Sequence, residues 1–157
     1  SNFLNFNKIY ENYSRNIKEI SNHRKDWIYI QFKKITKDLK NLKKIGVLGL
    51  AYKENTNSIK NSPSISFIKK ISLSNKYTIN VFDPKIKKLS EHSNINICKN
   101  INDVMKNCEI LFLATPWEIF KKIKLKKFKN IKAIIDPYNL INFSTDQKKI
   151  KHISMGN

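Results

Sequence analysis

The apolar residues follow a helical spacing up to about residue 39 and a different spacing after it. In the first part they recur every three or four positions, as on one face of an α-helix. The recurring positions are Tyr10, Tyr13, Ile17, Ile20, Trp27, Ile28, Gln31, Ile35 and Leu39. No proline or glycine occurs before Gly46, so the pattern predicts one long helix over residues 10–39, or two helices with a break near Ser21-Asn22.

After residue 42, short apolar runs alternate with amphipathic stretches. We expect strands at 44–50, 77–83, 94–98, 109–114, 131–136 and 150–154. We expect helices at 62–74, 85–91, 101–107 and 117–122. This alternation predicts βαβ units, and therefore a parallel sheet with helices on both faces. The expected fold is α/β, a Rossmann-like parallel sheet flanked by helices at 43–157 and preceded by a long helical arm at 1–42.

One strand–loop–helix corner carries the strongest indication of a ligand site. An apolar run ends in Gly49-Leu50-Ala51, so a buried strand enters a tight turn, and Lys53 follows at the carboxyl end of that strand, where open α/β sheets bind ligands. Ser62-Pro63 has the order of a helix N-cap followed by proline at the first helical position. Together, Lys53, Thr56 and Lys60 favour an anionic ligand. The alternative interpretation of Lys53 is a side chain that only reaches solvent.

The same corner does not match a dinucleotide-binding fingerprint. Gly46, Gly49 and Ala51 lack the Gly-x-Gly-x-x-Gly spacing that brings a helix N-terminus to a pyrophosphate. Asp83, at the end of the second expected strand, has the position of a ribose-binding acid, but an Asp-Pro turn explains it equally well. We therefore expect a Rossmann-like shape without a complete NAD site.

Several segments, taken in order, resemble the UDP-glucose/GDP-mannose dehydrogenase family. Residues 49–53, Thr56 and residues 60–63 are similar to the family's Gly-Leu-Ala-Phe-Lys, the Thr after it, and Asp-x-Arg-x-Ser-Pro. The other segments that resemble family elements are 22–27, 81–84, 114–120, 134–136 and 153–156. The resemblance covers nearly the whole chain from about residue 14 on.

The resemblance implies that the chain is the C-terminal, nucleotide-sugar-binding part of an NAD-dependent nucleotide-sugar 6-dehydrogenase. The parent enzyme would oxidise UDP-glucose, or a related UDP- or GDP-sugar, to the uronic acid, and would be a homodimer. In that family a cysteine of a Gly-rich Cys-Phe-Pro-Lys-Asp type motif holds the intermediate as a thiohemiacetal. Neither that motif nor the NAD-binding domain has a match here, so we expect no catalytic residue and an inactive chain. The arm at 1–42 would be the end of the middle domain.

The resemblance also implies roles for four residues. Lys53 matches a lysine that reaches the nucleotide-sugar substrate, and Tyr52 beside it replaces a phenylalanine while keeping an aromatic surface. Lys60 matches an arginine near the cofactor phosphates but offers a point charge in place of a bidentate fork. Tyr138 stands where many members carry an arginine that touches the uridine nucleotide, and its ring could stack on a base. We therefore expect Tyr52, Lys53 and Tyr138 to bind substrate and Lys60 to contact NAD.

Two other functions have some support in the sequence. The chain has 31 basic and 12 acidic residues, and a net charge of +19 attracts nucleic-acid phosphates. Nearly all of these basic residues are lysines spread along the chain, densest at 121–129, and aromatic residues are not interleaved with them as a stacking platform. Nucleic-acid binding therefore ranks last.

The second interpretation is a non-catalytic nucleotide- or partner-binding module. It is favoured by lysine at position 60 and tyrosine at position 138, where the family pattern has arginine.

Other classes of function find no support in the sequence. No apolar run approaches the roughly 18 residues that a membrane span needs. Cys98 and Cys108 lie in no ligand spacing, and His23, His92 and His152 form no metal motif. We expect a cytoplasmic protein with reduced thiols. Because only three glycines occur, its turns should depend on Asn, Asp, Ser and Pro.

Overall fold

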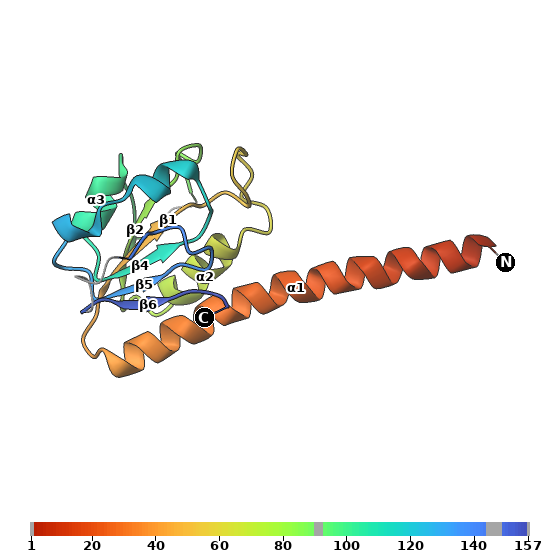
Figure 1. Cartoon of the computed structure of the whole chain (residues 1–157), viewed down its shortest axis with the longest axis horizontal. Coiled ribbons are helices and arrows are strands. Elements are labelled where there is room, and N and C mark those ends of the chain that lie inside the picture. The colour runs from red at the N-terminus through yellow and green to blue at the C-terminus, as the bar shows by residue number, and fades with distance from the viewer. Residues whose placement is uncertain (1, 90–92, 144–148, 157) are drawn as a thin grey trace.

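A six-stranded parallel sheet forms the centre of the molecule (Figure 1). The structure is a computed structural model, and it describes residues 2–89, 93–143 and 149–156. The strands are β1 (Lys44–Leu48), β2 (Thr78–Phe82), β3 (Ile95–Ile97), β4 (Ile110–Leu113), β5 (Ala133–Ile135) and β6 (Lys151–Ile153). Their order across the sheet is β3-β2-β1-β4-β5-β6, and every neighbouring pair is parallel. The expected α/β fold is confirmed.

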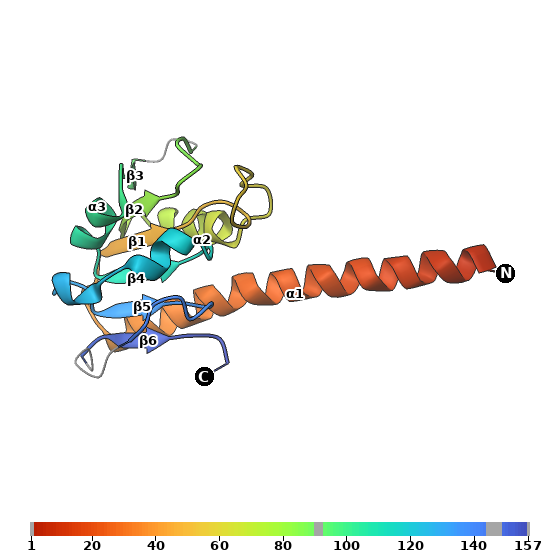
Figure 2. The same ribbon diagram turned by 45° about the horizontal axis from the view of Figure 1, so that its top comes forward.

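The helical arm is one continuous helix, α1 (Asn2–Asp38), without a break near Ser21-Asn22. It begins earlier than the expected start at residue 10. Its C-terminal part packs on the domain, where Ile28, Phe32 and Ile35 are buried, while its N-terminal part projects well away from the sheet (Figures 1 and 2). Neither α1 nor another helix in the described part of the chain is both long and apolar enough to cross a membrane.

Helices cover both faces of the sheet. On one face lie α1 and α2 (Pro63–Ser72), where the ring of Phe67 contacts the rings of Phe32 and Phe112 at centroid distances of 5.2 and 5.3 Å. On the other face lie α3 (Ile101–Lys106) and two 3₁₀-helices, η1 (Glu118–Lys122) and η2 (Leu125–Lys127) (Figures 1 and 2). A Cβ at Gly46 would lie 2.8 Å from Val104 and 2.9 Å from Cys108, so α3 packs directly against β1.

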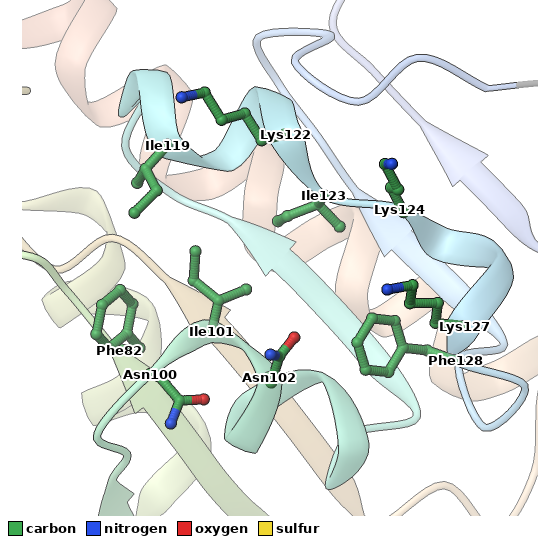
Figure 3. Close-up of a pocket in the computed structure, with 10 residues that line it drawn as sticks. All are labelled: Phe82, Asn100, Ile101, Asn102, Ile119, Lys122, Ile123, Lys124, Lys127 and Phe128. Atoms are coloured by element: carbon green, nitrogen blue, oxygen red, sulfur yellow. The ribbon is translucent and has the colours of Figure 1, made fainter.

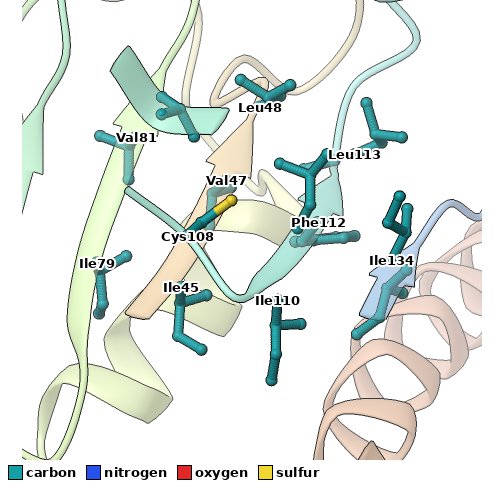
Figure 4. Close-up of a cluster of buried hydrophobic side chains, with 14 of the residues drawn as sticks. Ile45, Val47, Leu48, Ile79, Val81, Cys108, Ile110, Phe112, Leu113 and Ile134 are labelled. Carbon is teal, nitrogen blue, oxygen red and sulfur yellow. The ribbon is translucent and has the colours of Figure 1, made fainter. Parts of the chain in front are cut away.

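The central strands are apolar on both faces because both faces are covered. Ile45, Val47 and Leu48 of β1 are fully buried, as are all residues of β4 (Figure 4). This burial explains why these strands are continuous apolar runs in the sequence. Burying such side chains contributes roughly 1.5–3 kcal/mol each to folding.

Two helix predictions need correction. Residues 85–89 of the helix expected at 85–91 are not helical, and residues 90–91 lie outside the described residues. Asp83 accepts the backbone N–H groups of residues 85 and 86 as a helix N-cap would. However, Lys85, Lys87 and Lys88 would place three cations in the first turn, where the helix dipole disfavours positive charge. The helix expected at 117–122 is the 3₁₀-helix η1, and η2 was not expected.

Among the described residues, asparagines occupy every left-handed position that is not a glycine, so this glycine-poor chain does use other residues in its turns. Asn41, Asn55, Asn61, Asn75 and Asn139 have positive φ angles between 48° and 67°. Asparagine adopts this conformation more readily than most other residues that carry a side chain.

Candidate functional site

The turn after β1 lies at the carboxyl edge of the sheet, directly beside the end of β4. Gly49 in this turn has a φ of +95°, a left-handed conformation that glycine adopts without a side-chain clash. A Cβ there would lie 2.6 Å from both the backbone N and the Cβ of Thr115. The Thr115 hydroxyl donates a hydrogen bond to the carbonyl of Ala51 at 2.8 Å. Thr115 therefore fills the space beside the turn.

The carboxylate of Asp83 holds this turn from the β2 side. Its Oδ2 accepts the backbone N–H groups of Leu50 (2.7 Å) and Ala51 (3.0 Å) and the indole N–H of Trp117 (3.2 Å). Its Oδ1 accepts the two backbone N–H groups that follow Pro84, at 2.7 and 3.0 Å. Burial by itself raises the pKa of Asp83, but the four backbone donors outweigh burial and hold the pKa below its ordinary value. Asp83 thus forms the Asp-Pro turn, and its oxygens are occupied within the protein.

Helix α2 begins where the sequence predicts. Pro63 is its first residue, and Ser62 has the extended conformation of an N-cap. The Ser62 side chain makes no capping hydrogen bond, however. Its Oγ lies 2.8 Å from the Oγ of Ser64, and the Ser64 hydroxyl donates to the carbonyl of Leu50 at 3.3 Å. These contacts tie the start of α2 to the turn after β1.

Three of the four predicted site residues lie on the loop between this turn and α2. Tyr52 is 49% exposed, and Lys53 and Lys60 are exposed as well. The loop closes on itself, because the backbone N–H of Tyr52 donates to the carbonyl of Ser58 at 2.8 Å. It extends from the carboxyl end of β1 beyond the sheet (Figures 1 and 2). A ligand at this edge would therefore meet these side chains from solvent.

The fourth predicted residue, Tyr138, lines a cavity of about 200 Å³. The walls come from α1, the start of α2 and the segments that follow β4, β5 and β6. The lining residues are Ile28, Pro63, Ala114, Pro137, Tyr138 and Met155. Tyr138 is 36% exposed, so its side chain meets both the cavity and solvent.

The structure places the four predicted residues at one edge of the sheet but not in one cavity. Tyr138 and the start of α2 share the cavity, while Tyr52 and Lys53 are not among its lining residues. Strand β4 separates β1 from β5 in the sheet. Lys60 lies in the exposed loop, three positions before Pro63, which lines the cavity.

Asp136 also lies at this edge, and it was not among the predicted site residues. It is fully buried at the end of β5, and its Oδ2 accepts the N–H of Ile141 at 2.9 Å and lies 3.8 Å from Nε2 of His152. Its Oδ1 has no hydrogen-bond partner among the described residues. Burial lowers the pKa of His152, while the nearby Asp136 carboxylate acts in the opposite direction. In the sequence, Asp136 comes directly before Pro137, as Asp83 comes before Pro84, and this shared Asp-Pro pair could have identified Asp136.

Cysteines and histidines form no metal cluster in the described part of the chain. No group of three or more His, Cys, Asp and Glu side chains there could hold a metal ion. Burial raises the pKa of the Cys108 thiol to about 12, so this thiol stays protonated near neutral pH. Burial also raises the pKa of Cys98. His92 lies outside the described residues.

A dinucleotide does not fit the turn after β1. A dinucleotide site needs a glycine-rich turn that leads directly into a helix and lets the backbone approach the pyrophosphate. Here Thr115 fills the space beside Gly49, and residues 49–62 separate β1 from α2. The oxygens of Asp83 already accept five hydrogen bonds, so they are not available to a ribose.

Known proteins match this chain in sequence and in fold. A family model for the UDP binding domain of the UDP-glucose/GDP-mannose dehydrogenase family matches residues 46–143. The UDP-glucose 6-dehydrogenase of Rickettsia conorii is 33% identical over 118 residues, which cover 71% of this chain and 27% of that protein.

Two solved structures share the fold at lower identity. The UDP-N-acetyl-mannosamine dehydrogenase Cap5O from Staphylococcus aureus matches 85% of this chain and 31% of its own, with a TM-score of 0.65 and 20% identity. The NDP-N-acetyl-D-galactosaminuronic acid dehydrogenase from Methanosarcina mazei Go1 matches 85% of this chain and 29% of its own, with a TM-score of 0.68 and 19% identity. At such identities the likeness shows the fold.

Proposed function

Because the chain belongs to the UDP-glucose/GDP-mannose dehydrogenase family through its UDP-binding domain, we propose that it binds the nucleotide sugar in an NAD-dependent nucleotide-sugar 6-dehydrogenase. The whole enzyme would oxidise UDP-glucose, or a related UDP- or GDP-sugar, to the uronic acid. The chain spans 27% of the length of the Rickettsia relative, so catalysis would need further domains, and we expect this chain alone to be inactive.

The observation that carries this proposal is the cavity at the carboxyl edge of the sheet. Open α/β sheets bind ligands outside the carboxyl ends of their strands, and this cavity is lined by segments that follow β4, β5 and β6. The side chains that line it are apolar apart from the Tyr138 hydroxyl. Such an apolar surface suits the flat face of a base. The ring of Tyr138 would stack on the base, while the exposed Lys53 and Tyr52 would contact the diphosphate and the sugar.

Lys60 would contact the NAD phosphates from the exposed loop. We assign the remainder of the cofactor site to an NAD-binding domain elsewhere in the enzyme, because the turn after β1 does not accept a dinucleotide. We propose that residues 1–42 are the connector from the middle domain and that residues 43–157 are the nucleotide-sugar-binding domain. The enzyme would be a homodimer.

A non-catalytic nucleotide-binding module is the second candidate. It is favoured by lysine at position 60 and tyrosine at position 138, where the family pattern has arginines. Arginine can form two parallel hydrogen bonds to a phosphate, which neither lysine nor tyrosine can do. Reduction of NAD by the whole enzyme with UDP-glucose would exclude this candidate. Binding of UDP without NAD reduction by the whole enzyme would support it.

Replacing Tyr138 is expected to weaken UDP binding to this chain by about tenfold, because stacking of a base on an aromatic ring is worth about 1–3 kcal/mol. Tyr138→Leu removes the ring, whereas Tyr138→Phe keeps it and should retain most of the affinity. Lys53→Gln is expected to weaken binding by about threefold through loss of a phosphate contact. Isothermal titration with UDP at low salt measures each effect.

Lys99→Gln is the matched control, since Lys99 is also exposed but follows β3 at the far edge of the sheet. It removes the same charge and should leave the affinity within about twofold. Equal losses for Lys53→Gln and Lys99→Gln would show attraction by net charge alone. Unchanged UDP affinity in Tyr138→Leu would exclude the cavity as the base site.

A further inference from the structure

A second hollow lies on the opposite face of the sheet, between α3 and the two 3₁₀-helices (Figure 3). We call it the lysine groove, and its volume is about 470 Å³. It is lined by Phe82, Asn100, Ile101, Asn102, Ile119, Lys122, Ile123, Lys124, Lys127 and Phe128. Its volume lies within the range of about 300–1,000 Å³ found for sites that bind small molecules.

The floor of the lysine groove is apolar. Ile101 from α3 and Ile119 from η1 point toward one another across it, and Ile123 lies between η1 and η2 (Figure 3). Phe82 and Phe128 close its two ends. Ile119 is 46% exposed, so part of this floor meets solvent. A ligand that covered it would remove this apolar surface from solvent.

The rim of the groove is positively charged. Lys122, Lys124 and Lys127 line it, and no acidic side chain lines it in the part of the chain that the structure describes. Lys121, directly before Lys122, is paired with Glu118 at 2.5 Å. The ion pairs found among the described residues include none of the three rim lysines. In Figure 3 the end of the Lys127 side chain points into the groove, whereas those of Lys122 and Lys124 point outward from its edge. Three lysines beside an apolar floor complement a ligand that is both negative and apolar.

The groove is separate from the proposed nucleotide site. The cavity that contains Tyr138 is walled by α1 and the start of α2, which cover one face of the sheet. The groove is walled by α3, η1 and η2, which cover the other face. No residue lines both, so each can be tested without disturbing the other.

We propose that the lysine groove binds a small organic anion, with its carboxylate or phosphate at the lysine rim and its apolar body on the isoleucine floor. Neither part of the site suffices alone: the three exposed lysines would attract any anion weakly, and Ile119 with the half-buried Ile101 and Ile123 would hold any apolar body weakly. The combination selects ligands that carry both groups.

The test is a ¹H–¹⁵N NMR titration of the whole 157-residue chain with octanoate. Shifts should be concentrated at residues 100–102 and 119–128, with saturation in the millimolar range. Acetate, which lacks the apolar body, and 1-octanol, which lacks the charge, should each bind at least about tenfold more weakly. Octyl phosphate in a parallel titration distinguishes a phosphate from a carboxylate as the preferred head group.

Two matched pairs of variants test the two parts of the site. Changing Lys122, Lys124 and Lys127 to Gln should weaken octanoate binding by about tenfold, while the same change at the exposed Lys33, Lys34 and Lys37 of α1 should leave it within about twofold. Ile119→Ser should weaken binding by about threefold, and Ile30→Ser, at a position 49% exposed on α1, should not.

Three results would overturn the proposal. Octanoate shifts scattered over lysines outside the groove would show only attraction by the net charge. Equal losses for the two triple-lysine variants would show the same. Acetate binding as tightly as octanoate would remove the role of the apolar floor.

Discussion

Replacing Gly49 with alanine is expected to lower the free energy of unfolding by about 3 kcal/mol or more, the largest effect we expect from a single added methyl group. The φ of +95° disfavours a side chain, and the new Cβ would lie 2.6 Å from the backbone N of Thr115. Backbone atoms at the end of β4 cannot move aside as a flexible side chain could, since Ala114 N–H is bonded to the carbonyl of Leu48. Urea denaturation followed by circular dichroism measures the loss.

Gly156→Ala is the control for backbone conformation alone. Gly156 has a φ of +92°, close to that of Gly49, but a Cβ there would meet nothing within 4 Å. It should lower the free energy of unfolding by about 1–2 kcal/mol. Similar losses in both variants would mean that contact with Thr115 contributes little, and a stable Gly49→Ala would contradict the close packing of the turn against β4.

Asp83→Asn is expected to lower the free energy of unfolding by about 2–4 kcal/mol. The carboxylate accepts five hydrogen bonds in a position only 1% exposed. Asparagine keeps one acceptor oxygen but turns an NH₂ group toward N–H donors, which leaves buried donors without partners. Asp26→Asn is the control, because Asp26 is exposed and makes one surface ion pair with Lys70, and it should change stability by less than about 1 kcal/mol.

The same variant tests the pH dependence of stability. The pKa of Asp83 in the folded protein lies below its ordinary value of 3.8, so the carboxylate contributes stability above pH 3.8 that is lost as the pH falls through the folded value. Asp83→Asn should therefore lose less stability than the native chain as the pH falls below 3.8. Parallel pH profiles for the two proteins would contradict an ionised, hydrogen-bonded Asp83. Denaturation midpoints measured between pH 2 and pH 7 give both profiles.

The fold could be predicted from the sequence because its signals are local. Each strand is a short apolar run, and both faces of the central strands are buried, so runs such as residues 110–113 identify themselves without knowledge of their neighbours. The start of α2 was equally clear, since proline at a first helical position needs no distant contact. The helix expected at 85–91 was wrong at 85–89 because the lysines there oppose the helix dipole, an effect that apolar spacing does not reveal.

The candidate site was less predictable because it depends on distant contacts. The sequence predicted Tyr52, Lys53, Lys60 and Tyr138 as site residues, and both this assignment and their roles stay predictions. It could not identify the cavity beside Tyr138, since its wall joins residues as far apart as Ile28 and Met155. Residues 121–129 were described only as the stretch where lysines are densest. The buried Leu125 and Phe128 there, and the groove beside them, follow only from packing on the sheet.

The central claim is that the carboxyl edge of this sheet binds a uridine nucleotide, and an NMR titration of the chain with UDP tests it most directly. GDP and inorganic pyrophosphate serve as comparisons, and the method detects dissociation constants near 1 mM, about −4 kcal/mol. We expect UDP to shift Tyr52, Lys53 and residues 136–139 and to bind more tightly than pyrophosphate. Shifts from UDP that are scattered over surface lysines and reproduced by pyrophosphate would contradict the claim.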